Sequence, residues 1–306
     1  MTEADQKPVA LYLTTPDYLG SVCDIQNIST ICHRHGVLLA VDNAHGAYLR
    51  FLSPSRHPID LGADIACDSA HKTLSVLTGG AYLHLGTHLP AFFRENAKEA
   101  LALFGSTSPS YLILQSLDAA NRFLYEEGVT RFTETATAVS ELRNRLMAHG
   151  YTLVGEEPLK ITLATKPYGY RGNEFAKLLR EWNVECEFSD PDFVVLMVSP
   201  MLLGQDLLRL KEILLTIERR QPIERRQPIN ESAPRFSIPR RVLSVREALF
   251  SPTVEISVKN ALGRVLAHPS VGCPPAVPIL VCGEEIDQAS IDAFAYYGIT
   301  SCRVIQ

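Results

Sequence analysis

Two short polar segments in the first quarter of the chain carry side chains that can do covalent and acid–base chemistry. The first is DNAH at 42–45, and the second is DSAHK at 68–72. Each follows an apolar run of the length that is typical of a buried strand. Because ligands collect at the carboxyl ends of the strands in a parallel sheet, we expect both segments to face one crevice.

A carboxylate, an imidazole and a lysine in one crevice suggest a site for pyridoxal phosphate. A lysine amine forms a Schiff base with an aldehyde cofactor. An aspartate beside the pyridine nitrogen keeps that nitrogen protonated and so makes the ring an electron sink. The sequence therefore favours Lys72 as the covalent lysine and Asp42 as its carboxylate partner, with Ser69 and His71 able to donate to a phosphate.

Each of these side chains also has a simpler explanation, which the sequence leaves open. Asp42 and Ser69 could cap turns. His45 and His71 could be hydrogen-bonded histidines of the core, and Lys72 could be a solvated surface lysine. The case for chemistry therefore depends on the order and spacing of the whole set.

A metal site is not expected. His84 and His88 have the four-residue spacing of metal ligands on a helix, but a glycine and a proline nearby break that geometry. Asp42, His45 and His71 could form a metal or hydrolase set, yet neither a further ligand nor a G-x-S-x-G motif accompanies them.

The elements that must position these residues alternate between strands and helices. Strands are expected at 9–15, 37–44, 62–70 and 79–86, with a helix at 22–35. The alternation favours an α/β domain with a mostly parallel sheet. Apolar spacing from 90 to 149 predicts three helices. The second starts after Ser106, Thr107 and Ser108, with Pro109 near its first turn, and ends at Gly128, while the third ends at Gly150.

The second half of the chain divides into smaller pieces. Residues 151–218 predict strand, strand, helix, strand, strand and helix, which suggests a small α+β domain. The hexapeptide ERRQPI then occurs twice in tandem, and we interpret 219–236 as a linker. In the tail we expect helices near 244–249 and 287–297 and a strand over 279–283.

Length and composition exclude several classes of protein. The 306 residues suggest about two domains, with a third small one possible, and the net charge of −5 provides no electrostatic footprint for nucleic acid or anionic lipid. We find neither an apolar run of the ~18 residues that a membrane helix needs nor a secretory signal. The seven cysteines form no C-x-x-C pair and predict reduced, mostly buried thiols in a cytoplasmic protein.

Long stretches of the chain resemble the bacterial ornithine/lysine/arginine decarboxylase family. The stretches AVDNAHGAYLRF and GADIACDSAHKTLSVLTGGAYLHL contain the family's D-x-A-H and S-x-H-K elements, and a T-S-P segment follows at 107–109. The tail ALGRVLAHPSVGCPPAVPILVCGEEI resembles the family's C-terminal domain. The resemblance implies fold type I, the aspartate-aminotransferase fold. Its parts would be the remainder of the pyridoxal-phosphate large domain at 1–128, the small domain with a leading helix at 129–218, the linker at 219–236 and a decarboxylase-type domain at 237–306.

The resemblance also implies a role for individual residues. Lys72 would hold pyridoxal 5′-phosphate as a Schiff base, and Asp42 would pair with the pyridinium nitrogen. Ser69 and His71 would contact the phosphate, and His71 is one candidate for the acid that returns a proton after decarboxylation. These implied catalytic residues are therefore Lys72, Asp42 and His71.

Further implied contacts lie around the ring and across a subunit boundary. Ala44 and His45 would line the ring pocket, whereas Thr107 and Ser108 would reach the cofactor of a partner subunit. The expected working unit is therefore a homo-oligomer built from dimers, or an association with a full-length family subunit.

The activity that the resemblance implies is loss of CO2 from ornithine, lysine or arginine. Family members carry a long N-terminal segment, whereas here Asp42 follows only 41 residues, so we expect a truncated sheet and impaired cofactor binding. The alternative is an inactive paralogue or fragment that associates with a full-length subunit. Another fold type I reaction, such as transamination or sulfur removal from cysteine, fits the decarboxylase-like tail less well.

Overall fold

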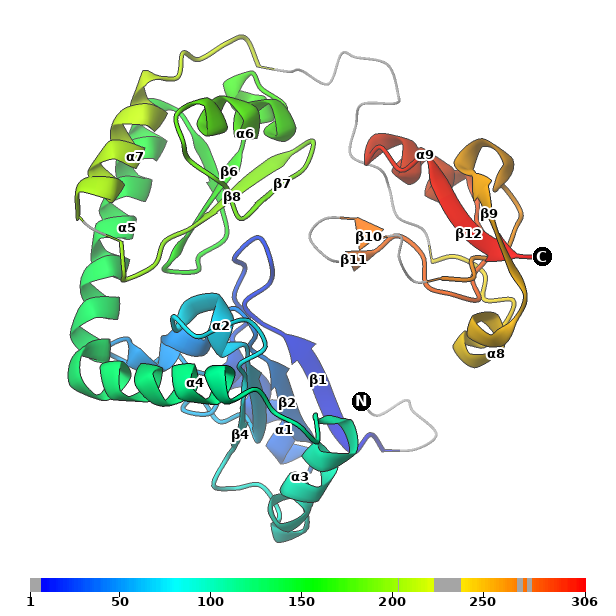
Figure 1. Cartoon of the computed structure of the whole chain (residues 1–306), viewed down its shortest axis with the longest axis horizontal. Helices are drawn as coiled ribbons and strands as arrows, with labels where there is room; N and C mark the ends of the chain where they lie inside the picture. The colour runs from blue at the N-terminus through cyan, green and yellow to red at the C-terminus, as the bar shows by residue number, and fades with distance from the viewer. Residues whose placement is uncertain (1–6, 203, 223–237, 269–271, 274–276) are drawn as a thin grey trace. The chain divides into compact units, whose positions relative to one another are not determined.

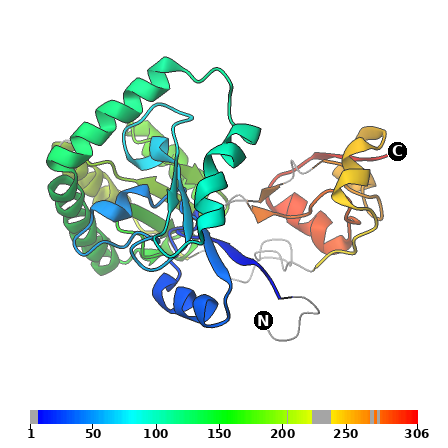
Figure 2. The same ribbon diagram turned by 90° about the horizontal axis from the view of Figure 1, so that it is seen from below.

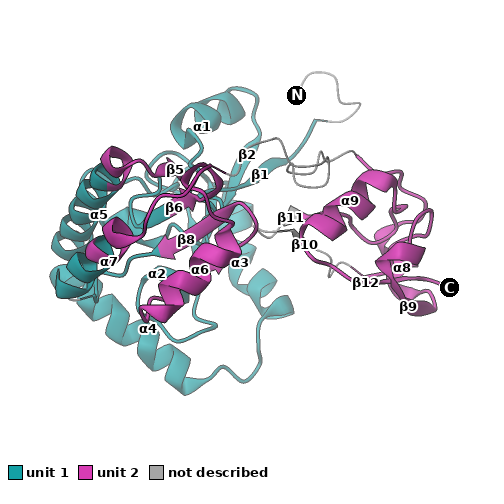
Figure 3. Ribbon diagram, turned by 90° about the horizontal axis from the view of Figure 1, so that it is seen from above, with its two compact units in different colours: residues 1–145, 154–161, 197–211 teal, residues 146–153, 162–196, 212–306 magenta. Residues whose placement is uncertain are grey.

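The computed structural model describes residues 7–202, 204–222, 238–268, 272–273 and 277–306, and Figure 1 gives the order of their elements. Two compact units contain them (Figure 3). The first comprises 1–145, 154–161 and 197–211, and the second comprises 146–153, 162–196 and 212–306. The domain boundaries expected from the sequence stay predictions, and most of the expected linker lies outside the described residues.

The first unit contains a four-stranded sheet in the order β1-β2-β3-β4. The strands are β1 (Ala10–Thr14), β2 (Leu38–Asp42), β3 (Ile65–Asp68) and β4 (Tyr82–Leu85). The first three run parallel and β4 runs antiparallel to β3. The mostly parallel sheet expected from the apolar runs is confirmed.

One face of this sheet forms a core with α1 (Ile25–Arg34), which starts at the N-cap Asp24. The core residues are Ile25, Cys32, Val37, Leu39, Val41, Ala63 and Ala66. Figure 2 places α1 and α4 on opposite sides of the sheet. Residues that alternate with the core positions, such as Asp42 and Cys67, are half-buried or exposed. Parallel sheets are usually covered on both faces. Because these alternating positions are not buried, the described residues cover the second face of this sheet only in part.

Three helices follow the sheet: α3 (Ala91–Phe104), α4 (Tyr111–Phe123) and α5 (Val129–His149). The expectation that Gly128 ends the second helix is wrong, because the π turn η2 (Leu124–Gly128) joins α4 directly to α5. Figure 1 shows the helix changing direction there. A Cβ at Gly128 would lie 3.2 Å from Cδ1 of Phe51, so this glycine permits close packing instead of ending the helix.

The start of α4 agrees with the expectation. Its N-cap is Ser110, so the helix begins after Ser108 and Pro109 lies directly before the cap, near the first turn. The expected end of the third helix is confirmed, because α5 stops at His149 and Gly150 has a φ of 107°. Such a left-handed backbone conformation favours glycine.

A second sheet has the order β5-β6-β8-β7 and lies mostly in the second unit. Its strands are β5 (Thr152–Val154), β6 (Lys160–Ala164), β7 (Phe188–Ser189) and β8 (Phe193–Met197). The short helix η3 (Lys166–Tyr168) follows β6, and α6 (Gly172–Glu181) and α7 (Gly204–Thr216) complete the segment. The predicted succession of strands and helices over 151–218 is confirmed.

The C-terminal segment pairs β9 (Thr253–Ser257) antiparallel with β12 (Ser301–Ile305). Both expected helices are present as α8 (Val245–Phe250) and α9 (Gln288–Tyr296). The remaining elements are η5 (Val258–Asn260), β10 (Gly272–Cys273) and β11 (Val277–Pro278).

The strand expected over 279–283 is wrong. Ile279 and Leu280 are buried in the core of this segment without strand pairing, and Gly283 has a φ of 92°. A short apolar run shows burial but does not distinguish a strand from a buried loop.

Free cysteines of the described part of the chain are Cys23, Cys32, Cys67, Cys186, Cys282 and Cys302, of which Cys32, Cys282 and Cys302 are buried. Cys23 and Cys67 are exposed, so burial is less general than expected. Among the described residues, no helix has the length and apolar character needed to cross a membrane.

Candidate active site

Asp42 ends β2, and its carboxylate is oriented by two donors. Oδ1 accepts the backbone N–H of Ala44 at 3.1 Å, and Oδ2 accepts the hydroxyl of Tyr12 at 3.3 Å. The next residue, Asn43, donates its backbone N–H to Cys67 at 2.9 Å and so ties the ends of β2 and β3 together. Asp42 thus caps a turn, as its simpler explanation proposed, and at the same time presents a carboxylate at the strand end.

His45 is the buried centre of this region, with 4% of its surface exposed. Its Nε2 lies 3.1 Å from Nζ of Lys72, and its ring meets the ring of Tyr18 edge-on at a centroid distance of 4.9 Å. Burial, reinforced by the charges of Lys160 and Lys72, lowers the pKa of His45 to about 3. The imidazole is therefore neutral at physiological pH and accepts the hydrogen bond from Lys72.

A neutral His45 that accepts at Nε2 carries its proton on Nδ1. That nitrogen is buried, and no described residue accepts from it. A buried N–H without a partner costs free energy. The Nδ1–H of His45 is therefore a buried donor that no described residue satisfies.

The segment that contains Lys72 forms α2 (Ala70–Thr73), a single helical turn. Ser69 precedes it, but its side chain makes no capping hydrogen bond, so the hydroxyl does not serve the role that its simpler explanation gave it. Nδ1 of His71 lies 3.1 Å from the carbonyl oxygen of Gly80. Because a carbonyl only accepts, His71 carries a proton on Nδ1 and leaves Nε2 for another partner.

Thr107 and Ser108 lie apart from this group. Both are exposed in the connection between α3 and α4, where the backbone N–H of Ser108 donates to the hydroxyl of Ser106 at 3.1 Å. The structure therefore brings Lys72 and His45 into contact. The same two strand ends carry the other expected residues, Asp42, Ala44, Ser69 and His71. Thr107 and Ser108 have no contact with this group in the described part of the chain.

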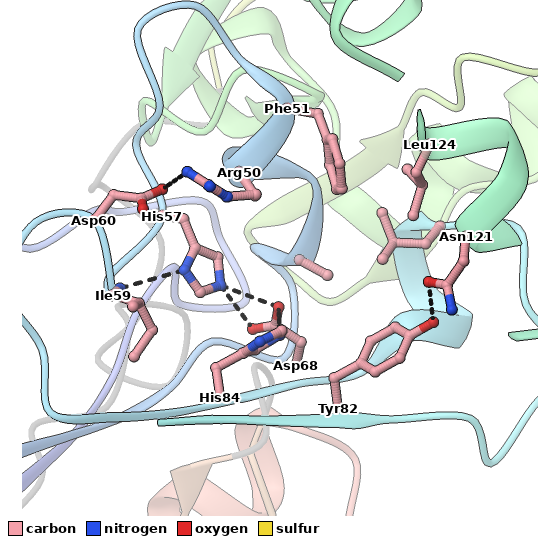
Figure 4. Close-up of a pocket in the computed structure, with 12 residues that line it drawn as sticks. Arg50, Phe51, His57, Ile59, Asp60, Asp68, Tyr82, His84, Asn121 and Leu124 are labelled. Atoms are coloured by element: carbon pink, nitrogen blue, oxygen red, sulfur yellow. Dashed lines mark hydrogen bonds and ion pairs between the residues drawn. The ribbon is translucent and has the colours of Figure 1, made fainter. Parts of the chain in front are cut away.

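Asp68 forms a second polar group that the sequence analysis did not anticipate (Figure 4). His57 and His84 approach Oδ2 of Asp68 through their Nε2 atoms at 3.0 and 2.9 Å, and Asn43 donates to Oδ1 at 2.7 Å. Burial alone would raise the pKa of Asp68, but these hydrogen bonds lower it to about 2. The carboxylate is thus held in its charged form.

The three side chains of this group have the composition of a metal site, with ligand atoms within 4.8 Å of one another. However, Nδ1 of His57 accepts the backbone N–H of Ile59 at 3.2 Å, so the proton of neutral His57 is on Nε2. A protonated nitrogen cannot bind a metal ion. His57, Asp68 and His84 therefore form a hydrogen-bonded network.

A cavity of about 240 Å³ adjoins this network (Figure 4). Its apolar wall includes Phe51 and Leu124. Its other polar groups are paired with one another: Arg50 with Asp60 at 2.6 Å, and Tyr82 with Asn121 at 2.9 Å. Each described polar side chain of the wall therefore already has a partner.

Comparison with known proteins gives a consistent family relationship. Residues 1–166 match the model of the Orn/Lys/Arg decarboxylase major domain. The chain is 30% identical over 295 residues to an arginine decarboxylase of Bacillus subtilis (strain 168), and 28% identical over 299 residues to one of Bacillus anthracis. Each alignment covers 92% of this chain and 60% of the relative. The chain thus spans about 60% of the length of these relatives.

Solved structures show the same fold. A constitutive lysine decarboxylase of E. coli superposes with a TM-score of 0.72 at 17% identity, covering 98% of this chain and 58% of that chain. The lysine decarboxylase of Francisella novicida gives a TM-score of 0.77 at 17% identity, with coverage of 99% and 58%. These similarities confirm the expected α/β fold of the type I pyridoxal-phosphate decarboxylases.

Proposed function

Because the chain belongs to the Orn/Lys/Arg decarboxylase family, we propose that it contributes the lysine site of a pyridoxal-phosphate-dependent decarboxylase of basic amino acids. The observation that carries the proposal is the contact between Lys72 and the buried, neutral His45 at the strand end formed by Asp42. The relatives are arginine and lysine decarboxylases, which supports ornithine, lysine or arginine as the substrate class.

The residues present fit pyridoxal phosphate. Lys72 offers an amine for the aldehyde carbon, and Asp42 offers a carboxylate for a protonated ring nitrogen. The unpartnered Nδ1–H of His45 and the hydroxyl of Ser69 are donors for oxygen atoms of an anionic ligand. His71 adds a ring nitrogen, Nε2, that its contact with Gly80 leaves available.

The chain's own residues supply orientation and proton control. When bound, pyridoxal phosphate supplies an electron sink for the charge left behind when CO2 departs. Nε2 of His45 holds the amine of Lys72 in place, and the donors Ala44 N–H and Tyr12 O–H fix the carboxylate of Asp42. A fixed carboxylate keeps a proton on a ring nitrogen that lies against it. His71 can hold a second proton at Nε2 and return it after the loss of CO2.

We also infer that the working unit contains more than one chain. Helix α3 buries none of its residues among the described part of the chain, and Phe92 and Phe104 are 68% and 93% exposed. Exposed apolar surface of this kind marks a site of association. Thr107 and Ser108, which directly follow this helix, would then be delivered to the site of a second subunit, either another copy or a full-length relative.

The second candidate function is that of an inactive subunit or fragment that associates with a full-length relative. One observation favours it: Tyr12 on the outer strand of the first sheet is 67% exposed, so this strand offers an uncovered surface to a partner.

Reductive trapping distinguishes the two candidates. The protein is incubated with pyridoxal phosphate, reduced with borohydride, and digested so that mass spectrometry locates each pyridoxyl-lysine. We expect preferential labelling of Lys72, loss of that peptide's label in Lys72→Ala, and no loss in Lys98→Ala on the exposed face of α3. Release of CO2 from arginine, lysine and ornithine then measures turnover. Labelling of Lys72 no greater than that of exposed lysines would refute the enzyme proposal.

A further inference from the structure

A buried ion pair lies in the first unit outside the group of residues that the proposed reaction uses. Nζ of Lys160 lies 2.7 Å from Oε2 of Glu157, and their side chains are 1% and 0% exposed. Removing two charges from water is costly and is offset only where further hydrogen bonds satisfy them. Lys160 also donates to the carbonyl of Asp17 at 3.1 Å, and Tyr48 donates to Oε1 of Glu157 at 3.4 Å.

This pair is joined to the turn that follows β1. The backbone N–H groups of Glu156 and Glu157 both donate to the carbonyl of Gly20, at 2.7 and 2.9 Å. Gly155 has a φ of 71°, and a Cβ there would lie 2.4 Å from the carbonyl oxygen of Leu19. The backbone approach therefore depends on a glycine, and the turn is held at Asp17 by a side chain and at Gly20 by the backbone.

Tyr18 lies in the middle of this turn and connects the ion pair to the site. Nζ of Lys160 is 5.7 Å from the centroid of the Tyr18 ring, and the same ring meets His45 edge-on at 4.9 Å. His45 in turn contacts Lys72. A chain of contacts thus runs from Glu157 through Lys160, Tyr18 and His45 to Lys72.

We propose that Lys160 is a positioning residue for the His45–Lys72 pair: anchored by Glu157, it fixes Tyr18 against His45 and adds a second positive charge beside the imidazole, so that His45 remains a neutral acceptor. The inference rests on the proposed function only in taking Lys72 as the reactive amine. An acceptor at Nε2 holds the amine in one place, whereas a protonated imidazole would repel the lysine.

The charges around His45 support this role. Lys72 on α2 contacts His45 directly, whereas Lys160, at the start of β6, contacts Tyr18 on the turn, whose ring meets His45. After burial, Lys160 and then Lys72 are the groups that lower the pKa of His45. Glu157 faces Lys160, with Tyr48 and Asp17 as further neighbours of the pair.

Two substitutions separate the effect of charge from a general loosening of the structure. Lys160→Met keeps the length of the side chain and removes its charge. Glu157→Gln keeps an acceptor for Lys160 and removes the carboxyl group, whose pKa burial raises to about 7, so this variant also removes the titration of Glu157 from the measured range. If Lys160 acts through charge, only the methionine variant makes His45 easier to protonate. If the pair merely holds the fold together, both variants admit water and change His45 in the same direction.

The experiment follows the ring resonances of His45 by NMR in protein labelled with ¹³C-histidine, assigned with a His45→Phe variant, between pH 4 and 8. We expect no titration of His45 in the unsubstituted protein or in Glu157→Gln. In Lys160→Met we expect the midpoint to rise by about 1–2 units, into the measured range. Lys160→Arg, which keeps the charge, should behave as the unsubstituted protein does.

Two outcomes would overturn the proposal. One is titration of His45 between pH 4 and 8 in Glu157→Gln. The other is a titration midpoint of His45 that is unchanged in a folded Lys160→Met. If Lys160→Met does not fold, Lys160→Gln, which also removes the charge, replaces it in the same measurement and must raise the midpoint of His45 for the proposal to stand. The titrations use protein without cofactor. Reductive trapping at Lys72 is a separate measurement. If it fails, the proposed function is refuted, but the expected titration behaviour of His45 in the variants can still be observed.

Discussion

The side-chain amine of Lys72 lies 3.1 Å from Nε2 of His45, across 27 residues of sequence. His45 is anchored by burial and by the edge of the Tyr18 ring, whereas Lys72 belongs to a single turn of helix. A long, flexible lysine held by a rigid acceptor loses fewer conformations when it reacts, because its amine is already located.

Replacing His45 by Phe removes the acceptor and keeps an aromatic side chain. We expect labelling of Lys72 by pyridoxal phosphate and borohydride to fall roughly 3- to 10-fold, the equivalent of one hydrogen bond. Labelling of the exposed Lys98 in the same digest serves as the internal control. Equal labelling of Lys72 in the variant and the unsubstituted protein would show that His45 does not position the amine.

Asp42→Asn tests the carboxylate without removing its shape. Asparagine can still accept the N–H of Ala44 but carries no charge with which to keep a ring nitrogen protonated. We expect the rate of CO2 release to fall by roughly 10²-fold or more, as for the loss of other preorganised electrostatic groups, while trapping at Lys72 persists. Asp118→Asn, on the exposed side of α4, is the matched control. Similar rates in the two variants would remove Asp42 from the mechanism.

Much of the fold could be predicted from sequence because burial and glycine leave simple patterns. Each apolar run of the first sheet ends in polar residues, and Gly150 adopts the left-handed conformation expected beyond a helix. The prediction that Gly128 ends a helix is wrong because a glycine can also permit close packing, here against Phe51. The strand predicted over 279–283 is wrong because an apolar sequence indicates burial but not strand pairing.

The site was predictable only where its residues are near a strand end. His45 and Lys72 come into contact because neighbouring parallel strands, the first of which ends at Asp42, terminate at the same edge. The partners of Glu157 could not be foreseen, since Tyr48 is 109 positions away in sequence. His57 and His84 reach Asp68 from a loop and from an antiparallel strand, and their spacing along the chain contains no sign of this contact.

The network at Asp68 predicts a pH dependence of stability. The pKa of Asp68 is about 2 in the folded protein and about 4 in an unfolded chain. The unfolded chain therefore binds more protons as the pH falls, so stability decreases between about pH 5 and pH 2. The charged network contributes about 2 kcal/mol above that window.

Asp68→Asn should therefore lower the free energy of unfolding by about 2 kcal/mol at pH 7. Urea unfolding at pH 7 and pH 3 measures the difference between the variant and the unsubstituted protein. At pH 3 we expect that difference to shrink by roughly half, since the unfolded chain is then largely protonated. A difference that stays constant with pH would mean that Asp68 is not held in its charged form.

Substitutions of two phenylalanines, one buried and one exposed, test the packing of the first unit. Phe132 is fully buried and stacks on Tyr48 and Phe51 at centroid distances of 5.8 and 5.9 Å. Phe132→Ala should cost about 3–5 kcal/mol of unfolding free energy because it leaves a cavity. Phe104→Ala, at a position that is 93% exposed, should change it by less than about 0.5 kcal/mol. Chemical denaturation measures both, and equal costs would contradict the core as described.

The outermost strand of the first sheet supplies the last prediction. In the described part of the chain, β1 pairs with β2 alone, whereas β2 lies between β1 and β3. Most residues of β1 are exposed, whereas the inner positions of β2 are buried. Because local opening is easiest where few contacts must break, amides at 10–14 should exchange with solvent on the order of tenfold faster than those at 38–42.

Hydrogen–deuterium exchange with mass spectrometry measures this difference on peptides that cover 9–15 and 37–44. It is combined with sedimentation, which reports whether the chain is alone in solution. In a monomer, fast exchange at 9–15 would show an open sheet edge that is ready to pair with another polypeptide. Equal, full protection of both peptides in a monomer would contradict that open edge.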